Sequence, residues 1–177
     1  MIDFNYETEF TIENEEAIAT WLSRVIVSEN KKEGEINYIF CDDEYLLKIN
    51  LEYLNHDTLT DIISFDYSMG NELNGDIFVS VERVRDNAND FNVSFEEELK
   101  RVLVHGVLHY CGYKDKTEHD ERIMRLKEEE KMKLLEDELV FNYLSDDAED
   151  DDSDADDPLL QMSLTKGINK KRTKLVN

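Results

Sequence analysis

Residues 94–111, SFEEELKRVLVHGVLHYC, form the segment on which the expected fold depends. Ser94 is followed three residues later by Glu97, a spacing typical of the capping box that starts a helix. Gly112 comes at the point where a helix needs a left-handed residue to stop, because glycine adopts that conformation without a Cβ penalty. The sequence therefore predicts a helix with a firm start and a turn that brings the chain back toward it.

Outward from this helix, short runs rich in Ile, Phe and Val and bounded by Asn, Asp or Gly predict β-strands. They are INYIFC (36–41), TDIISFDY (60–67) and GDIFVSV (75–81), with a further extended segment near DFNYETEFTI (3–12). Other helices are expected at EEAIATWLSRVIVSE (15–29), at DEYLLKINLEYL (43–54) and from Thr117 through ERIMRLKEEEKMKLLEDEL (121–139). We expect the charged face of this last helix to be solvated surface. The expected fold class is α+β, a small mixed sheet packed with helices.

The composition changes abruptly after Leu144. SDDAEDDDSDADDP (145–158) has almost nothing to bury, and a segment of this kind cannot offset its ordering entropy. We therefore expect residues 145–177 to be a disordered acidic tail that ends in a basic tip, KGINKKRTKLVN (166–177). Residues 1–144 are expected to form one folded domain, because a chain of this length accommodates a single core.

The chain of 177 residues carries a formal net charge of −23. The expected tail holds nine acids and five bases, so residues 1–144 keep a net charge of −19. Surfaces that bind phosphate are normally basic, and this charge by itself argues against a nucleic-acid partner. A nucleic acid would have to meet a local patch.

No apolar run approaches the length needed to span a membrane, and the start, MIDFNYETEF, carries acids where a secretory signal would be basic and then apolar. These features predict a cytoplasmic protein with no membrane partner. Cys41 and Cys111 form no CxxC pair, which fits a reducing compartment. We expect two buried thiols and no disulfide.

His105 and His109 are four residues apart on the expected helix, so both imidazoles project from one face within reach of a single ion. Asp115 lies three residues beyond Gly112, in the loop after the helix. Its carboxylate could be the third ligand, so that a metal-binding helix is followed by a loop ligand. Three protein ligands would leave one position open for water, which is typical of a catalytic site. The alternative is that the two histidines are hydrogen-bonded core or surface residues without a metal.

Gly106 occupies the position that Glu takes in the H-E-x-x-H helix of zinc proteases. That Glu polarises the attacking water, so its replacement argues against peptidase activity. A glycine inside a helix costs roughly 1 kcal/mol relative to alanine, which suggests that another part of the structure approaches the backbone closely there.

Residues 105–115, HGVLHYCGYKD, resemble H-G-x-L-H-x-x-G-Y-D-H, the signature of the YbeY endoribonucleases, and the match includes Gly106. Upstream, TDIISF (60–65) and NGDIFVS (74–80) resemble the T-D-V-L-S-F and G-D-I strands of the same family. The resemblance implies a metal-dependent hydrolase that cuts single-stranded RNA in ribosomal RNA maturation, including end processing of small-subunit rRNA, and in ribosome quality control. It also implies His105 and His109 as catalytic residues, and single-stranded RNA, ribosomal RNA and the small ribosomal subunit as partners.

The sequence departs from the family pattern at two positions. Asp115 stands where the signature has its third histidine, so we expect one divalent metal ion, zinc in the first place, with an oxygen ligand that other divalent ions also accept. His119 is the competing third ligand, and we favour Asp115 because it preserves the spacing of H-x-x-x-H-x-x-G-x-x-H. Leu54 stands where many family members have an arginine expected to meet phosphate, so phosphate contact must come from elsewhere or be weaker.

Four further polar residues lie in or near these motifs. Ser64 and Asp76 are candidates to orient water or ligand, with local hydrogen bonds as the alternative. Lys114 and Lys116 flank Asp115 and could supply positive charge, although exposed loop lysines are usually only solvated. Two other functions stay open: a zinc-dependent hydrolase of another substrate, and a noncatalytic ribosome-associated module with a structural metal.

Overall fold

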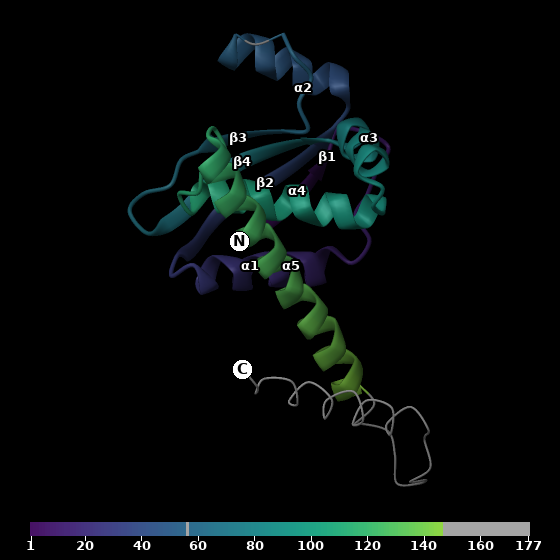
Figure 1. Cartoon of the computed structure of the whole chain (residues 1–177), viewed down its shortest axis with the longest axis vertical. Coiled ribbons are helices and arrows are strands. Elements are labelled where there is room, and N and C mark those ends of the chain that lie inside the picture. Colours follow the sequence, from purple (N-terminus) through teal and green to yellow (C-terminus); the bar gives the residue numbers. More distant parts are fainter. Residues whose placement is uncertain (56, 147–177) are drawn as a thin grey trace, which may run out of the picture. The chain divides into compact units, whose positions relative to one another are not determined.

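A four-stranded mixed sheet lies at the centre of the fold (Figure 1). The computed structural model describes residues 1–55 and 57–146. The strands are β1 (Ile2–Tyr6), β2 (Lys32–Cys41), β3 (Ile62–Asp66) and β4 (Glu72–Ser80), in the order β1-β2-β4-β3. Strands β1 and β4 run parallel to β2, whereas β3 runs antiparallel to β4. The expected small mixed sheet is confirmed, and each of the four extended segments overlaps one strand.

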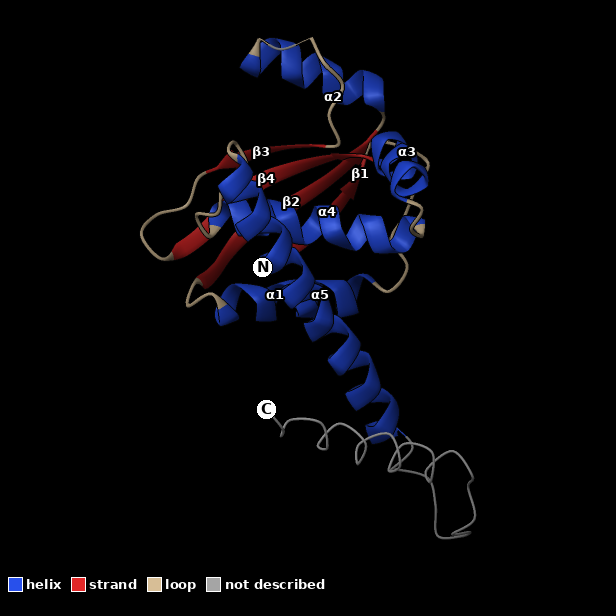
Figure 2. Ribbon diagram, viewed as in Figure 1, coloured by secondary structure: helices blue, strands red, loops and turns tan. Residues whose placement is uncertain are grey.

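Five α-helices accompany the sheet in the described part of the chain (Figure 2). They are α1 (Glu15–Ser28), α2 (Asp43–Ile49), α3 (Val81–Phe91), α4 (Phe95–Tyr110) and α5 (Glu118–Asp146), and a short π-helical turn, η1 (Asn50–Leu54), follows α2. The α+β class is confirmed. The single helix expected over 43–54 is divided into α2 and η1.

Helix α3 is missing from the sequence-based expectation, which extends a strand to Val81 instead. Ser80 ends β4 and caps α3, since its side chain accepts a hydrogen bond from the backbone N–H of Arg83 at 3.2 Å. The buried residues of this helix are Val81, Val84 and Ala88, so its apolar stripe is narrow. The expected strand end was wrong by one residue because the serine begins a helix there.

The two faces of the sheet are covered by different helices. Helices α1 and α4 pack on one face, and the buried core there includes Trp21, Leu22, Ile36, Ile77 and Leu103. Helix α2 packs on the opposite face, where its buried Leu46 joins a smaller cluster with Cys41 and Ile63. The candidate metal helix, α4, is thus held against the sheet by the main core.

Gly106 lies where α4 crosses β3 and β4. A Cβ atom at this position would stand 3.0 Å from Cδ1 of Ile62 and 3.1 Å from Cδ1 of Ile77. These separations are tighter than ordinary van der Waals contact, so glycine lets α4 approach the sheet closely. The close approach expected from a glycine inside this helix is confirmed.

Glu29, directly after α1, connects α1 with α5 and with the loop that follows α4. Its carboxylate accepts hydrogen bonds from the Tyr113 hydroxyl at 2.7 Å and from Nζ of Lys127 at 3.0 Å. It also forms an ion pair with buried Lys131 at 2.5 Å. Burial alone would raise the pKa of Glu29, but the hydrogen bonds from Lys131, Tyr113 and Lys127 lower it to about 2. Trp21 adds a second connection, because its Nε1 donates to the carbonyl of Lys131 at 2.8 Å.

None of the described helices is both long and apolar enough to cross a membrane. Cys41 is buried, Cys111 is partly buried and both thiols are free. The chain separates into two units, Met1–Val140 and Phe141–Asn177. Apart from residues 145 and 146, which continue α5, the tail expected over 145–177 lies outside the described residues.

Replacing Gly106 with valine should destabilise the fold, because the added carbons meet Ile62 and Ile77 at the crossing point. Overpacking of this kind costs roughly 1–3 kcal/mol. Urea unfolding followed by circular dichroism measures the change. Gly106→Ala is the graded control: it adds only the Cβ and gains about 1 kcal/mol of helix propensity, so it should lose less stability. Equal stabilities of the valine and alanine variants would contradict the close packing.

Glu29→Gln should lower the free energy of unfolding at neutral pH by about 1–3 kcal/mol. A carboxylate whose pKa is lowered by folding stabilises the fold above its ordinary pKa of 4.5, and this contribution is lost as the pH falls toward 2. The variant should therefore show a flatter stability profile over that acid range in urea titrations. Glu13→Gln, which changes an exposed acid in the loop before α1, is the control that should keep the wild-type profile. Identical profiles for wild type and Glu29→Gln would refute this role.

Candidate metal centre

His105, His109 and Asp115 converge beside the C-terminal half of α4. Nε2 of His105 lies 2.9 Å from Nε2 of His109, and Oδ2 of Asp115 lies 3.5 Å from the first and 3.4 Å from the second. Among the described residues, no second group of three His, Cys, Asp or Glu side chains is placed to share an ion. The structure brings together the three residues that the sequence singled out.

The turn after α4 carries Asp115 back to the histidines. The backbone N–H of Gly112 donates to the carbonyl of His109 at 3.0 Å, and that of Tyr113 donates to the carbonyl of Leu108 at 3.1 Å, which is the bond pair of a Schellman motif. Gly112 has a φ of 105°, in the left-handed region that favours glycine, as its place in the sequence predicts. The chain therefore leaves α4 through a defined turn rather than an arbitrary loop.

The second ring nitrogen of each histidine has its own partner. Nδ1 of His109 lies 3.1 Å from the carbonyl oxygen of Tyr113, and Nδ1 of His105 lies 2.7 Å from Oε1 of Glu128. Carbonyl and carboxylate oxygens only accept, so Nδ1 is the donor in both rings. In neutral rings both Nε2 atoms then carry lone pairs, which face each other across 2.9 Å. This arrangement requires a cation or a shared proton between them.

The three donor atoms fit a tetrahedral divalent ion. Zinc binds nitrogen and oxygen ligands at about 2.0–2.2 Å, so its tetrahedral ligand atoms stand about 3.4 Å apart. Two of the three separations, 3.4 and 3.5 Å, match this value, and the separation of 2.9 Å between the histidines is shorter. Three donors leave a fourth position free, and 42% of the Asp115 side chain is exposed, so solvent reaches the group.

The surrounding charges act differently on the two rings. Burial and the neighbouring His105 lower the pKa of His109, which favours the neutral ring that a metal ligand needs. Burial opposes protonation of His105 as well, but the hydrogen bond and charge of Glu128, together with Asp115, raise the pKa of His105 above its usual value. The acidic neighbours thus attract a positive charge to the histidine pair.

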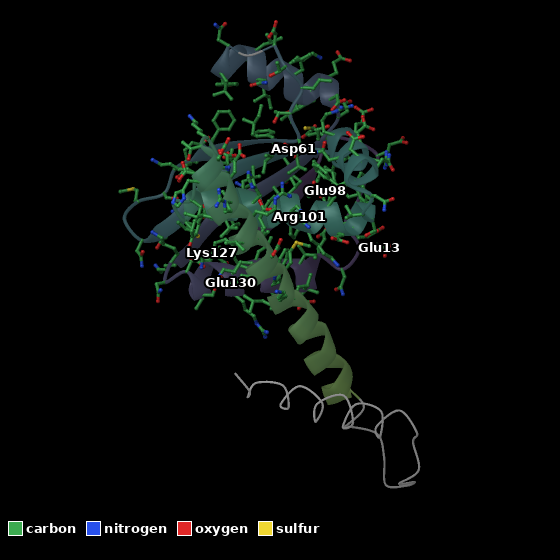
Figure 3. All side chains as sticks on the ribbon, viewed as in Figure 1. Glu13, Asp61, Glu98, Arg101, Lys127 and Glu130 are labelled. Atoms are coloured by element: carbon green, nitrogen blue, oxygen red, sulfur yellow. The ribbon has the colours of Figure 1, made fainter. Side chains whose placement is uncertain are left out.

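Glu128 on α5 is a neighbour of the site that the sequence reasoning missed. The expectation of a solvated charged face is wrong at this residue, which is only 5% exposed and contacts His105. Arg101, one turn before His105 on α4, places Nη1 3.6 Å from Oε2 of Glu128 and Nε 3.4 Å from Oε2 of Glu98. Figure 3 labels Arg101 and Glu98. Arg101 holds Glu128, and Glu128 orients the ring of His105. Glu128 lies one turn after Met124, which is also buried, but this spacing alone does not mark a glutamate among charged residues as buried.

Three other candidates are His119, Ser64 and Asp76, of which Ser64 shares with Ile77 the sheet face that packs against α4. His119 is exposed in the first turn of α5 and does not join the three converging side chains. Ser64 pairs with Ile77, the chain neighbour of Asp76, so the side chains of Ser64 and Asp76 lie on opposite faces of the sheet. Asp76 accepts a hydrogen bond from Nδ2 of Asn37 at 2.8 Å, which is the local role considered as the alternative.

Lys114 and Lys116 are exposed on either side of Asp115. Leu54, at the end of η1, is 47% exposed and does not line the cavity beside the histidines. No residue of η1 lines this cavity, so none of them can replace the phosphate contact of the missing family arginine.

A cavity of about 520 Å³ begins at His105 and Asp115 and is lined by residues of α3, α4 and α5. Asp61, just before β3, also lines it and accepts a hydrogen bond from Nδ2 of Asn87 at 3.1 Å. Asp61 belongs to the TDIISF motif, but sequence reasoning did not single it out. Three arginines also line it: Arg101, Arg122 and Arg125.

The chain matches a known protein family and several of its named members. The sequence model of the family described as Endoribonuclease YbeY matches residues 2–136. A Flavobacterium johnsoniae protein named Endoribonuclease YbeY is 76% identical over 135 residues, covering 76% of this chain and 97% of the relative. A Flavobacterium psychrophilum protein of the same name is 69% identical, covering 76% of this chain and 96% of the relative. A Porphyromonas gingivalis relative, again of this name, is 46% identical and covers 72% and 84%.

The fold has a solved counterpart. A solution structure of a Thermotoga maritima protein superimposes with a TM-score of 0.58 at 24% identity, covering 88% of this chain and all of that one. The family match spans the sheet, α4, the Gly112 turn and the part of α5 that carries Glu128. On this match and on the identity to its curated relatives, the chain belongs to the YbeY endoribonuclease family.

Proposed function

We propose that this chain is a metal-dependent endoribonuclease that cuts single-stranded RNA with one divalent ion, zinc in the first place, held by His105, His109 and Asp115. The observation that carries the proposal is the opposed pair of Nε2 atoms at 2.9 Å, whose Nδ1 partners are already bonded. A cation between these atoms removes the repulsion of their lone pairs. The carboxylate of Asp115 supplies a third donor and leaves one position open.

When bound, the ion supplies Lewis-acid chemistry toward a phosphodiester and lowers the pKa of water. The chain's own residues orient the donors. Glu128 fixes the ring of His105, and the carbonyl of Tyr113 does the same for His109. The nucleophile is either water or the ribose 2′-hydroxyl, and both routes use the same donors.

RNA is favoured over peptides as the substrate. Gly106 occupies the place of the catalytic Glu of zinc proteases. The general base that this Glu provides in a protease is therefore absent at this position. The relatives named Endoribonuclease YbeY align over the entire site, which supports RNA as the substrate.

We further infer a cytoplasmic role in ribosomal RNA maturation, at the ends of small-subunit rRNA, and in ribosome quality control. With a net charge of −23, the chain repels RNA at long range. The negative charge of the protein weakens its affinity for RNA, and docking on the small ribosomal subunit would supply the affinity that is missing.

Asp115→Ala should abolish metal binding and reduce RNA cleavage at least about 100-fold, because it removes a direct ligand. His119→Ala is the matched comparison and should leave both unchanged, since His119 is exposed outside the group. Metal content by elemental mass spectrometry and cleavage of a labelled single-stranded RNA measure the two effects. Full metal retention in Asp115→Ala, or its loss in His119→Ala, would overturn the ligand assignment.

The same assays separate the alternative functions. Hydrolysis of casein in place of RNA, lost in His109→Ala, would indicate a zinc hydrolase of another substrate. Bound zinc that stabilises the fold without any turnover would indicate a structural metal. RNA cleavage that survives His109→Ala would indicate a contaminating nuclease.

Glu128→Gln should weaken metal affinity by about 10–100-fold while the fold is kept, because the carboxylate partner of a ligating histidine is lost. Competition with a coloured chelator measures the affinity. Glu129→Gln is the control, since Glu129 is the exposed neighbour on the same helix. If both variants bind the ion as tightly as wild type, Glu128 has no such role.

A further inference from the structure

The cavity beside the candidate metal centre carries unpaired positive charge. Its volume of about 520 Å³ falls in the range of small-ligand sites, roughly 300–1,000 Å³. Arg122 and Arg125 line it from α5, three residues apart, and both are exposed. Among the side chains that the structure describes, over residues 1–55 and 57–135, neither guanidinium makes a hydrogen bond or an ion pair, and the charge of Arg125 acts on Glu98 only from a distance.

Arg101, the third arginine of the cavity, differs because it is committed to the protein. It lies within ion-pair distance of three carboxylates: Glu97 at 3.5 Å, Glu98 at 3.4 Å and Glu128 at 3.6 Å. Its side chain is 18% exposed. Arg101 therefore positions neighbouring groups, whereas the two guanidiniums of α5 are available to a ligand.

We propose that Arg122 and Arg125 bind phosphodiester groups of the RNA strand next to the cleaved bond, and that the cavity holds the adjoining nucleotide. This assignment rests on the proposed function and names its substrate contacts. A guanidinium offers paired, planar donors that match phosphate oxygens. Residues three apart on a helix are surface neighbours, so the two side chains can hold one phosphate or two successive ones.

An apolar wall completes the match to a nucleotide. Phe91 and Leu126 line the same cavity, yet they are 55% and 62% exposed. Large apolar side chains left open beside polar groups are typical of ligand sites. An unpaired base can stack on the ring of Phe91 while its phosphate meets the arginines.

Acidic residues limit how the cavity can bind RNA. Six of them line it: Asp61, Glu98, Asp115, Glu118, Glu121 and Glu128. They outnumber the arginines, so the cavity exerts no long-range attraction on RNA. Binding must come from direct, short-range contacts, which two unpaired guanidiniums supply. These contacts also provide the phosphate recognition that Leu54 cannot give.

The test compares Arg122→Gln, Arg125→Gln and the double variant with Lys133→Gln, which removes one exposed positive charge from the same helix outside this cavity. Binding of a labelled single-stranded RNA that carries 2′-O-methyl groups and phosphorothioate linkages, to resist attack by either nucleophile, is followed by fluorescence anisotropy at salt concentrations from about 50 to 200 mM. Each cavity variant should weaken binding by roughly 3–10-fold. Each should also reduce the slope of log affinity against log salt by about 0.7, and the double variant by about 1.4. Lys133→Gln should retain the wild-type slope.

Three outcomes are decisive. Wild-type affinity and slope in the double variant would overturn the assignment, even if the protein cleaves RNA normally. An equal loss in Lys133→Gln would also overturn it, because the effect would then be general charge. If wild type binds RNA and loses binding in the double variant but never cleaves it, the phosphate contacts stand and the proposed function fails.

Discussion

The site depends on two histidine Nε2 atoms that face each other at 2.9 Å. In a neutral ring that nitrogen cannot donate, because the one ring proton lies on Nδ1, engaged by Glu128 in His105 and by the Tyr113 carbonyl in His109. Two lone pairs held at this distance are unfavourable without a positive charge between them. The protein therefore maintains an arrangement that a cation stabilises.

Much of the surrounding structure maintains this arrangement. Gly106 lets α4 lie close to β3 and β4, which fixes the helix that carries both histidines. The ion pair of Glu29 with Lys131 fastens α5 to α1, three residues from Glu128 in the sequence. A shift of α5 would release the ring of His105. Fold stability and the geometry of the site are thus coupled through α5.

The sequence was sufficient for features that neighbouring residues determine. The four-residue spacing of His105 and His109, the left-handed stop at Gly112 and the following Asp115 are local, and the structure places them as these patterns predict. Glu128 and His105 are 23 residues apart, and charged residues surround Glu128 on its helix, so no local pattern marks it as buried. Helix α3 was missed for a related reason, because its polar sequence leaves only a narrow apolar stripe. Arg101 pairs with Glu97 and Glu98 at spacings that the sequence contains, but its ion pair with Glu128 depends on the packing of α5 against α4.

The central claim is that a divalent ion, and not a shared proton, lies between the two histidines. The most direct measurement is the metal content of the full chain purified without chelator and then supplied with one equivalent of zinc. The account predicts one tightly bound ion per chain, lost when His105 and His109 are both replaced by alanine. A chain that holds no ion under these conditions would contradict it, and the pair of histidines would then share a proton.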